Sequence, residues 1–79
     1  MVRQEMRVGI VGMGTIGRAI ANALDNGDLP VRLEAVNSRN DSKLREFVHT
    51  LQRRPEIMSL DTLIDACDLV IEAATQAIL

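Results

Sequence analysis

A glycine-rich turn near the start of the chain constrains its fold more than any other feature. The apolar run at residues 8–11 leads into Gly12, Gly14 and Gly17, and a helix-like spacing of apolar residues follows at once. A strand, a G-x-G-x-x-G turn and a helix in this order are typical of sites that hold the diphosphate of a dinucleotide. In such sites the first glycine permits the tight turn, the second lets the backbone approach the phosphates, and the third lets the helix pack close to its strand.

The helix that begins in this turn gives a second reason to expect a bound anion. Its first N–H groups have no partner inside the helix, and they point toward the turn together with the positive end of the helix dipole. The spacing alone also occurs in glycine-rich turns that bind no ligand. Its position between a strand and a helix, early in the chain, favours the dinucleotide interpretation.

Apolar runs and helical patterns alternate along the rest of the chain. We expect strands at residues 7–11, 33–36, 56–58 and 68–74, of which the third is the weakest. Three groups of apolar residues between these runs have helical spacing: Ile16, Ala19, Ile20, Ala23 and Leu24; Leu44, Phe47, Val48 and Leu51; and Leu60, Leu63, Ile64 and Cys67. The alternation predicts an α/β fold of the Rossmann type, with a parallel sheet in strand order 3-2-1-4 and helices on both faces.

Single residues mark the ends of these elements. Gly27 and Pro30 are expected to stop the first helix, and Ser59 is expected to cap the third. Glu34 interrupts the apolar run of the second strand, where a charged residue is out of place.

The length of the chain is small for this fold. Its 79 residues are about half of a typical dinucleotide-binding domain. We therefore expect residues 1–79 to form a partial domain that is truncated before the remaining strands, without a substrate or catalytic domain. The fourth strand would then have an open apolar edge, which predicts self-association or a homodimer.

Composition argues against several other classes of protein. The net charge is −2 and Phe47 is the sole aromatic residue, so a nucleic-acid surface is not expected. No apolar stretch approaches the roughly 20 residues that span a bilayer, so no membrane association is expected. The single cysteine, Cys67, cannot form an internal disulfide; we expect it to be buried among apolar residues and the protein to be cytoplasmic.

The ligand site is expected where the strand order reverses, between the first and fourth strands. In open parallel sheets, ligands bind there, outside the C-terminal strand ends. The glycine turn borders this point on one side, and Ala73, Ala74 and Thr75 border it on the other. The two alanines leave room for a cofactor. Thr75 could donate to a phosphate or ribose, or it could cap a following helix.

The end of the second strand bears on the choice of cofactor. An acidic residue about 20 positions after the last glycine normally binds the ribose hydroxyls of NAD. Asn37 stands at that position, and Ser38 and Arg39 follow. An amide, a hydroxyl and a guanidinium suit the 2′-phosphate of NADP, which a carboxylate would repel. NADP, or use of both NADP and NAD, is therefore favoured; Arg39 could instead be solvated or stack on the adenine.

No catalytic constellation is visible in the sequence. His49 falls on the polar side of its helix and has no second ligand nearby, so a solvated role is expected. Glu72 lies near the end of the fourth strand, where it could approach the site, but a single glutamate is weak support for acid–base chemistry.

Three segments resemble the N-terminal part of L-aspartate dehydrogenases and the related NAD-binding domains of the homoserine dehydrogenase type. They are the glycine motif at residues 8–17, the Ser-Leu-Asp-Thr-Leu segment at 59–63 and the run Asp-Leu-Val-Ile-Glu-Ala-Ala-Thr-Gln at 68–76. The glycine motif is shared by many oxidoreductases. The Glu-Ala-Ala-Thr-Gln segment after a Ser-Leu-Asp-x-Leu helix start is much narrower, and the similarity extends from about residue 6 to the end.

This resemblance implies NAD(P)-dependent oxidative deamination of L-aspartate to iminoaspartate, released as oxaloacetate and ammonia. It implies three groups of cofactor-binding residues: Gly12, Met13, Gly14, Thr15, Ile16 and Gly17 at the diphosphate; Asn37, Ser38 and Arg39 at the adenine ribose; and Ala73, Ala74 and Thr75 near the nicotinamide ribose. The family often has an acidic residue at the position of Asn37. Its catalytic histidine and substrate-binding domain lie beyond residue 79, so no catalytic residue is assigned.

Three functions stay open. The first is the cofactor portion of an L-aspartate dehydrogenase-like enzyme, inactive as an isolated chain. The second is a nucleotide-binding or redox-sensing module without catalysis. The third is the cofactor domain of another dehydrogenase, such as a homoserine dehydrogenase, because a fold does not determine a substrate.

Overall fold

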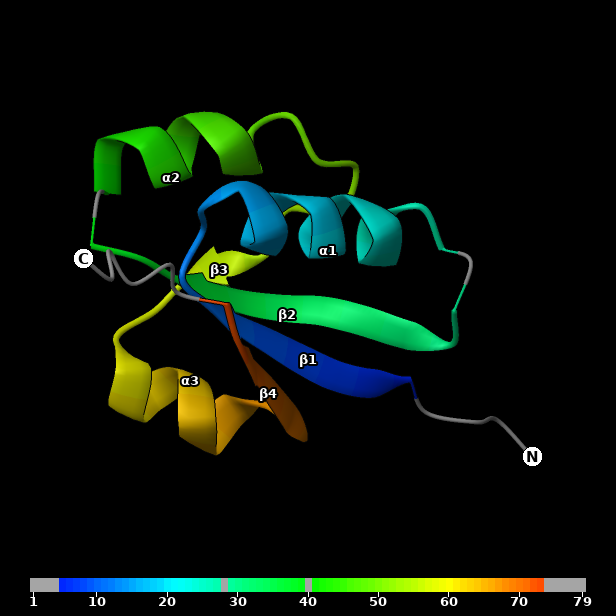
Figure 1. Ribbon diagram of the computed structural model, residues 1–79. Helices are drawn as coiled ribbons and strands as arrows, with labels where there is room; N and C mark the ends of the chain where they lie inside the picture. The colour runs from blue at the N-terminus through cyan, green and yellow to red at the C-terminus, as the bar shows by residue number, and fades with distance from the viewer. Residues whose placement is uncertain (1–4, 28, 40, 74–79) are drawn as a thin grey trace.

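Strands and helices alternate through the whole described part of the chain. The computed structural model describes residues 5–27, 29–39 and 41–73. The elements are β1 (Met6–Val11), α1 (Thr15–Asp25), β2 (Val31–Asn37), α2 (Asp41–Val48), β3 (Glu56–Ile57), α3 (Leu60–Ala66) and β4 (Leu69–Glu72). The strands pair in parallel in the order β3-β2-β1-β4. Helices α1 and α2 lie on one face of the sheet and α3 on the other (Figure 1). The predicted Rossmann-type architecture is confirmed.

The bounds of all four strands differ from the predicted ones by one or two residues at one or both ends. β2 begins at Val31, two residues before the predicted start. β4 ends at Glu72, which pairs with Val11, the last residue of β1. One further hydrogen bond joins the Ala73 N–H to the Val11 carbonyl at 2.8 Å, and the ladder stops where its partner strand turns away.

Glu34 occupies a β-bulge in β2. Val8 of β1 is opposite Leu33, whereas Gly9 is opposite Ala35, so Glu34 is the extra residue between them. The bulge interrupts the alternation of the strand, and Leu33 and Val36 consequently both join the apolar core. The Glu34 carboxylate forms an ion pair with Arg32. The charged residue that interrupts the apolar run is therefore the one that the ladder leaves unpaired.

The main core fills the space between the sheet and the helices α1 and α2. Its buried members are Ile10, Met13, Ala21, Leu33, Val36, Leu44, Val48 and Leu51. They include residues of β1, β2, α1 and α2, together with Leu51, which follows α2 in a tight turn closed by the Leu51 N–H on the Val48 carbonyl at 3.1 Å. The apolar spacing predicted for this helix therefore extends beyond the end of α2 at Val48, to the buried Leu51.

On the opposite face, Gly9 of β1 lets α3 approach the sheet. A Cβ atom at Gly9 would lie 2.6 Å from Leu63 Cδ2 and 2.8 Å from the sulfur of Cys67. Leu63 is fully buried there, whereas Leu60 and Ile64 of the same helix are exposed. Cys67 is only partly buried, contrary to expectation, because it follows α3 with an extended backbone at the rim of this contact.

The ends of the helices agree with the predicted signals. α1 ends before Gly27, whose φ of 80° lies in the left-handed region that glycine favours. The Ser59 side chain accepts a hydrogen bond from the Thr62 N–H and caps α3. In the described residues, none of the helices has the length and apolar character needed to cross a membrane.

Candidate dinucleotide-binding site

The C-terminal ends of three strands meet at the glycine turn. The Gly12 N–H donates to the Asn37 carbonyl at 2.7 Å, which ties the turn to the end of β2. The Ala73 N–H donates to the Val11 carbonyl, which ties it to the end of β4. In Figure 1 the turn lies at the end of β1, where the chain passes from the sheet into α1. Open parallel sheets bind ligands at such a point, outside the carboxyl ends of their strands.

The two first glycines of the turn serve different purposes. Gly12 has a φ of 92°, a backbone conformation that strongly favours glycine. Gly14 is the N-cap of α1 with an ordinary φ of −78°, so its backbone does not require glycine. No side chain caps the helix there, and the first turn of α1 contains no acidic residue. The helix N-terminus consequently presents its amides and partial positive charge without a competing side chain.

Gly17 is required by the turn itself. A Cβ atom at this position would overlap the carbonyl oxygen of Gly12 and come within 3.6 Å of the Cβ of Ala73. The sequence predicted close packing of α1 on its strand; the contact that excludes a side chain is with the glycine turn. Gly17 therefore keeps the turn, the start of α1 and the end of β4 together.

The other predicted residues of the turn face different surroundings. The Met13 side chain is buried in the main core, so only its backbone can reach a ligand at the glycine turn. Thr15 is exposed, and Ile16 has 63% of its surface exposed, which is unusual for a large apolar side chain. A ligand lying along the turn would cover the Ile16 side chain.

Asn37 has a structural contact that the sequence did not reveal. Its side-chain Nδ2 donates to the Met58 carbonyl at 2.7 Å, and the Met58 N–H donates to the Val36 carbonyl at 3.0 Å. The amide of Asn37 thus links the end of β2 to the segment between β3 and α3. A carboxylate in the same place would face the Met58 carbonyl without a proton to donate.

The remaining predicted residues follow β2 and β4, as far as the structure describes them. Ser38 is partly buried and Arg39 is exposed, directly after β2. Ala73 packs against the main core beside Gly17. Ala74 and Thr75 lie outside the described residues.

Arg18 is a residue near the turn that sequence reasoning missed. Its Nε donates to the Met13 carbonyl at 3.2 Å, and its guanidinium lies 5.4 Å from the centre of the Phe47 ring. Arg18 follows Gly17 directly in the first turns of α1, and Phe47 belongs to α2. A basic residue immediately after the third glycine was the available signal.

The ionisable groups with shifted pKa values lie at the other end of β1. Arg7 and Asp68 form an ion pair of 3.1 Å, and this contact lowers the pKa of Asp68 and raises that of Arg7. Burial raises the pKa of the neighbouring Cys67 thiol. The groups with shifted pKa values therefore lie at the N-terminal ends of β1 and β4, away from the glycine turn. Within the described ranges, no group of His, Cys, Asp and Glu side chains could hold a metal ion.

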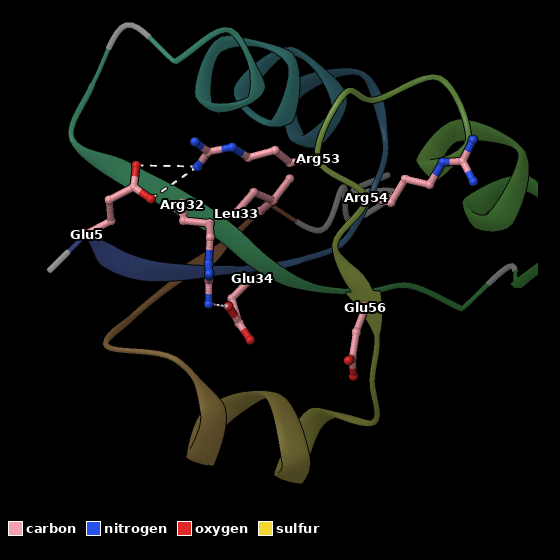
Figure 2. A pocket seen from close by; sticks show the side chains of 7 residues that line it. All are labelled: Glu5, Arg32, Leu33, Glu34, Arg53, Arg54 and Glu56. Carbon is pink, nitrogen blue, oxygen red and sulfur yellow. Dashed lines mark hydrogen bonds and ion pairs between the residues drawn. The ribbon is translucent and has the colours of Figure 1, made fainter.

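A hollow of the described surface lies away from the glycine turn. It has a volume of about 460 Å³ and is lined by Glu5, Arg32, Leu33, Glu34, Arg53, Arg54 and Glu56, beside the part of β2 that β3 does not cover (Figure 2). Arg32 pairs with Glu34, and Arg53 pairs with Glu5 at 3.1 Å. Because these charges largely compensate one another, the hollow offers no strong selectivity for either sign of ligand.

Comparison with known families agrees with this geometry. The profile described as "Homoserine dehydrogenase, NAD binding domain" matches residues 12–79, which is most of the chain. The chain belongs to this family. The match begins at Gly12, the first residue of the glycine turn, and therefore includes the whole turn.

Curated relatives of this family member are dehydrogenases. The chain is 42% identical over 71 residues to the L-aspartate dehydrogenase of Methanocella arvoryzae, and 43% identical over 70 residues to that of Bradyrhizobium diazoefficiens. These matches cover 90% and 89% of the chain. The chain spans about a quarter of the length of these relatives, 26% and 25% respectively.

Solved structures share the fold. UDP-N-acetylglucosamine 3-dehydrogenase of Acidithiobacillus ferrooxidans superposes with a TM-score of 0.74 at 27% identity, over 95% of this chain and 23% of that protein. Glutamyl-tRNA reductase of Methanopyrus kandleri superposes with a TM-score of 0.65 at 23% identity, over 92% of this chain and 18% of that protein. The second likeness shows the fold alone. The chain is thus a nicotinamide-dinucleotide-binding domain of the Rossmann type, in a family of oxidoreductases.

Proposed function

We propose that this chain is the cofactor-binding part of an enzyme that oxidises L-aspartate. The observation that carries the proposal is the glycine turn, where Gly12 has a positive φ and Gly17 packs so closely on the Gly12 carbonyl that a side chain would not fit. The relatives named L-aspartate dehydrogenase supply the substrate class. Groups that bind the substrate and move its protons would lie outside residues 1–79, because those relatives are about four times as long.

The residues around the turn fit a dinucleotide by their chemistry. The uncapped amides of α1 suit a diphosphate, and the absence of acidic residues from the first turn avoids repulsion. The proposed diphosphate site comprises Gly12, Met13, Gly14, Thr15, Ile16 and Gly17, through the backbone in the case of Met13. Ala73, and with it Ala74 and Thr75, would border the nicotinamide ribose. The bound nicotinamide would accept a hydride from the substrate.

We propose that NADP is bound at least as well as NAD. Asn37 stands where an acidic residue would select NAD, and its amide is already a donor to Met58. Arg39 is exposed directly after β2, and its positive charge favours a 2′-phosphate. Asn37 would therefore lie beside the adenine ribose while its side-chain amide stays bonded to Met58. Ser38 and Arg39 would contact the ribose and its phosphate through their side chains.

We further propose a homodimer or other self-association, and a cytoplasmic location. Leu69 and Val70 of β4 are exposed, as is Ile64 of the adjacent α3, which supports association through this side of the sheet. The cytoplasmic location rests on the single cysteine and stays a prediction. Sedimentation at rising protein concentration tests the first point; a monomer at all concentrations would contradict it.

Calorimetric titration with NADP and NAD tests dinucleotide binding. A Gly14→Val variant is expected to lose affinity for both cofactors because the added side chain would block the approach of the diphosphate to the backbone. An Ala19→Val variant is the control, since it places the same valine side chain at an exposed position of α1. Unchanged affinity in the Gly14 variant would contradict the proposed site.

A spectrophotometric assay tests whether the isolated chain binds cofactor without oxidising L-aspartate. With L-aspartate and NADP or NAD, the isolated chain is expected to bind cofactor and to show no increase in absorbance of the reduced nicotinamide. Turnover by this chain alone would refute the proposal that the substrate groups lie outside it. Cofactor binding without any activity in a longer protein that includes it would favour the non-catalytic module.

A further inference from the structure

Arg18 is held against the glycine turn by two contacts. Its Nε donates to the Met13 carbonyl at 3.2 Å, and its guanidinium lies over the Phe47 ring at 5.4 Å. The carbonyl belongs to the turn and the ring to α2, so the guanidinium lies between the glycine turn and α2. A long and flexible side chain is therefore kept in one place beside the proposed cofactor site.

The charge of Arg18 is treated differently from that of three other arginines. Arg7, Arg32 and Arg53 each form an ion pair with a carboxylate. Arg18 forms no such pair among residues 5–27, 29–39 and 41–73, and its described partners are a neutral carbonyl and an aromatic ring. Neither partner cancels a full positive charge, although both hold the group in position.

The hydrogen-bonding pattern leaves the useful side of the guanidinium for a ligand. The contact with Met13 uses Nε, whereas the described hydrogen bonds do not use the two terminal nitrogens. Arginine binds phosphate with two parallel N–H groups in a planar fork, and the contact with the Phe47 ring uses none of the guanidinium's N–H groups as a hydrogen bond in the described residues. An oriented and uncompensated guanidinium of this kind is suited to an oxyanion.

A dinucleotide such as NADP offers two phosphate groups to Arg18, the diphosphate and the 2′-phosphate. The diphosphate has the amides of α1 at Gly14 and the residues after it. Arg18 instead contacts Phe47, which lies in the last turn of α2. Helix α2 starts at Asp41, two residues after Arg39, and the Ser38–Arg39 segment is where the adenine ribose is expected. Because the diphosphate already has the α1 amides, the 2′-phosphate of the adenine ribose is the remaining phosphate for the Arg18 guanidinium.

We propose that Arg18 binds the 2′-phosphate of NADP, as a second guanidinium beside Arg39. This inference rests on the proposed dinucleotide function and deepens it by naming a residue that distinguishes NADP from NAD. Phe47 is the positioning residue for Arg18. An exposed surface arginine with a purely structural role would support α1 and α2 but would not discriminate between the two cofactors.

The test is calorimetric titration of the wild-type chain and an Arg18→Met variant with NADP and with NAD. Loss of one charged hydrogen-bonding group is expected to weaken NADP binding by about tenfold or more. NAD binding is expected to change by less than about threefold, because NAD lacks the 2′-phosphate. An Arg45→Met variant, which removes an exposed arginine of α2, is expected to leave the ratio of the two affinities unchanged.

A second variant covers the case in which Arg18→Met does not fold. Phe47→Leu keeps the guanidinium and removes the ring that orients it, so NADP binding is expected to fall by more than NAD binding. Thermal unfolding of each variant identifies those that remain folded. Equal losses for both cofactors in the folded variants would show a structural or diphosphate role and would overturn the proposal.

The wild-type titrations separate this inference from the proposed function. If the wild type binds neither cofactor, the proposed dinucleotide function fails, and the inference falls with it. If it binds NAD but not NADP, dinucleotide binding stands and the assignment of Arg18 is overturned. If it binds both and Arg18→Met changes the NADP-to-NAD ratio, the inference is supported.

Discussion

The side-chain amide of Asn37 donates to the backbone carbonyl of Met58 at 2.7 Å. The same residue receives, at its own carbonyl, the N–H of Gly12. One residue at the end of β2 therefore connects the glycine turn with the segment that leads into α3. Its amide nitrogen is a requirement of this link, because a carboxylate has no N–H to donate. The position at which related sites select NAD is thus constrained here by the fold.

Replacement of Asn37 by Asp is expected to destabilise the protein. The variant removes the donor to Met58 and places a negative charge near that carbonyl, at a cost of about 1–3 kcal/mol in the free energy of unfolding. Urea unfolding measures this change. Asn22→Asp is the matched control, since Asn22 is exposed on α1, and it is expected to have little effect. Equal effects of the two substitutions would show that the Met58 contact is unimportant.

Replacement of Gly17 by Ala is expected to distort the glycine turn. The new Cβ would overlap the Gly12 carbonyl, so the turn and the start of α1 must separate. Cofactor affinity, measured by calorimetry, is expected to fall at least tenfold. Gly27→Ala is the control: its left-handed backbone costs about 1–2 kcal/mol of stability, but no atom lies near the added methyl group. Affinity that survives in Gly17→Ala would refute this account of the turn.

Replacement of Gly9 by Ala is expected to push α3 away from the sheet. The added methyl group would meet Leu63 and Cys67 at 2.6–2.9 Å, and overpacking of this kind costs about 1–3 kcal/mol. The cost should shrink when Leu63 is also replaced by Ala, because the smaller side chain makes room. A double-mutant cycle by chemical unfolding measures this coupling. Strictly additive effects would mean that Gly9 and Leu63 do not compete for space.

The Arg7–Asp68 pair is expected to make stability depend on acid. The Arg7 guanidinium and N–H hold the pKa of Asp68 below its ordinary value of 3.8. The folded state therefore binds the proton less readily than the unfolded state, so the stabilisation is present above pH 3.8 and is lost as the pH falls through the lower folded value. Comparison of wild type and Asp68→Asn by unfolding across this range checks the effect, which added salt should weaken. Parallel pH curves for the two proteins would contradict it.

Local patterns in the chain were sufficient to predict much of the fold. The glycine spacing, the apolar runs and the helix caps at Gly27 and Ser59 are each encoded within a few consecutive residues. Such signals depend on backbone conformation and on side-chain periodicity, which need no knowledge of distant residues. The strand order followed from the alternation of strands and helices, and the weakness of β3 from its short apolar run.

The sequence predicted the candidate site less completely than it predicted the fold. The backbone of Gly12 and the closeness of Gly17 follow from the motif. The partner of the Asn37 side chain, Met58, lies 21 residues away, and Arg18 of α1 contacts Phe47 of α2. No periodicity in the sequence links these pairs. Glu34 looked like a defect in an apolar run, and its role as the extra residue of a bulge appeared only when β2 was aligned with β1.

The sequence by itself determined the elements, their order and the glycine turn, because these depend on interactions between neighbours along the chain. The tertiary structure decided which side chains are occupied by other parts of the fold and which are presented to a ligand. It assigned the amide of Asn37 to Met58 and placed the guanidinium of Arg18 beside the turn without a carboxylate partner in the described chain. Those outcomes depend on the packing of β2, α1 and α2 against one another, since contacts between distant residues exist only once the sheet and its helices have assembled.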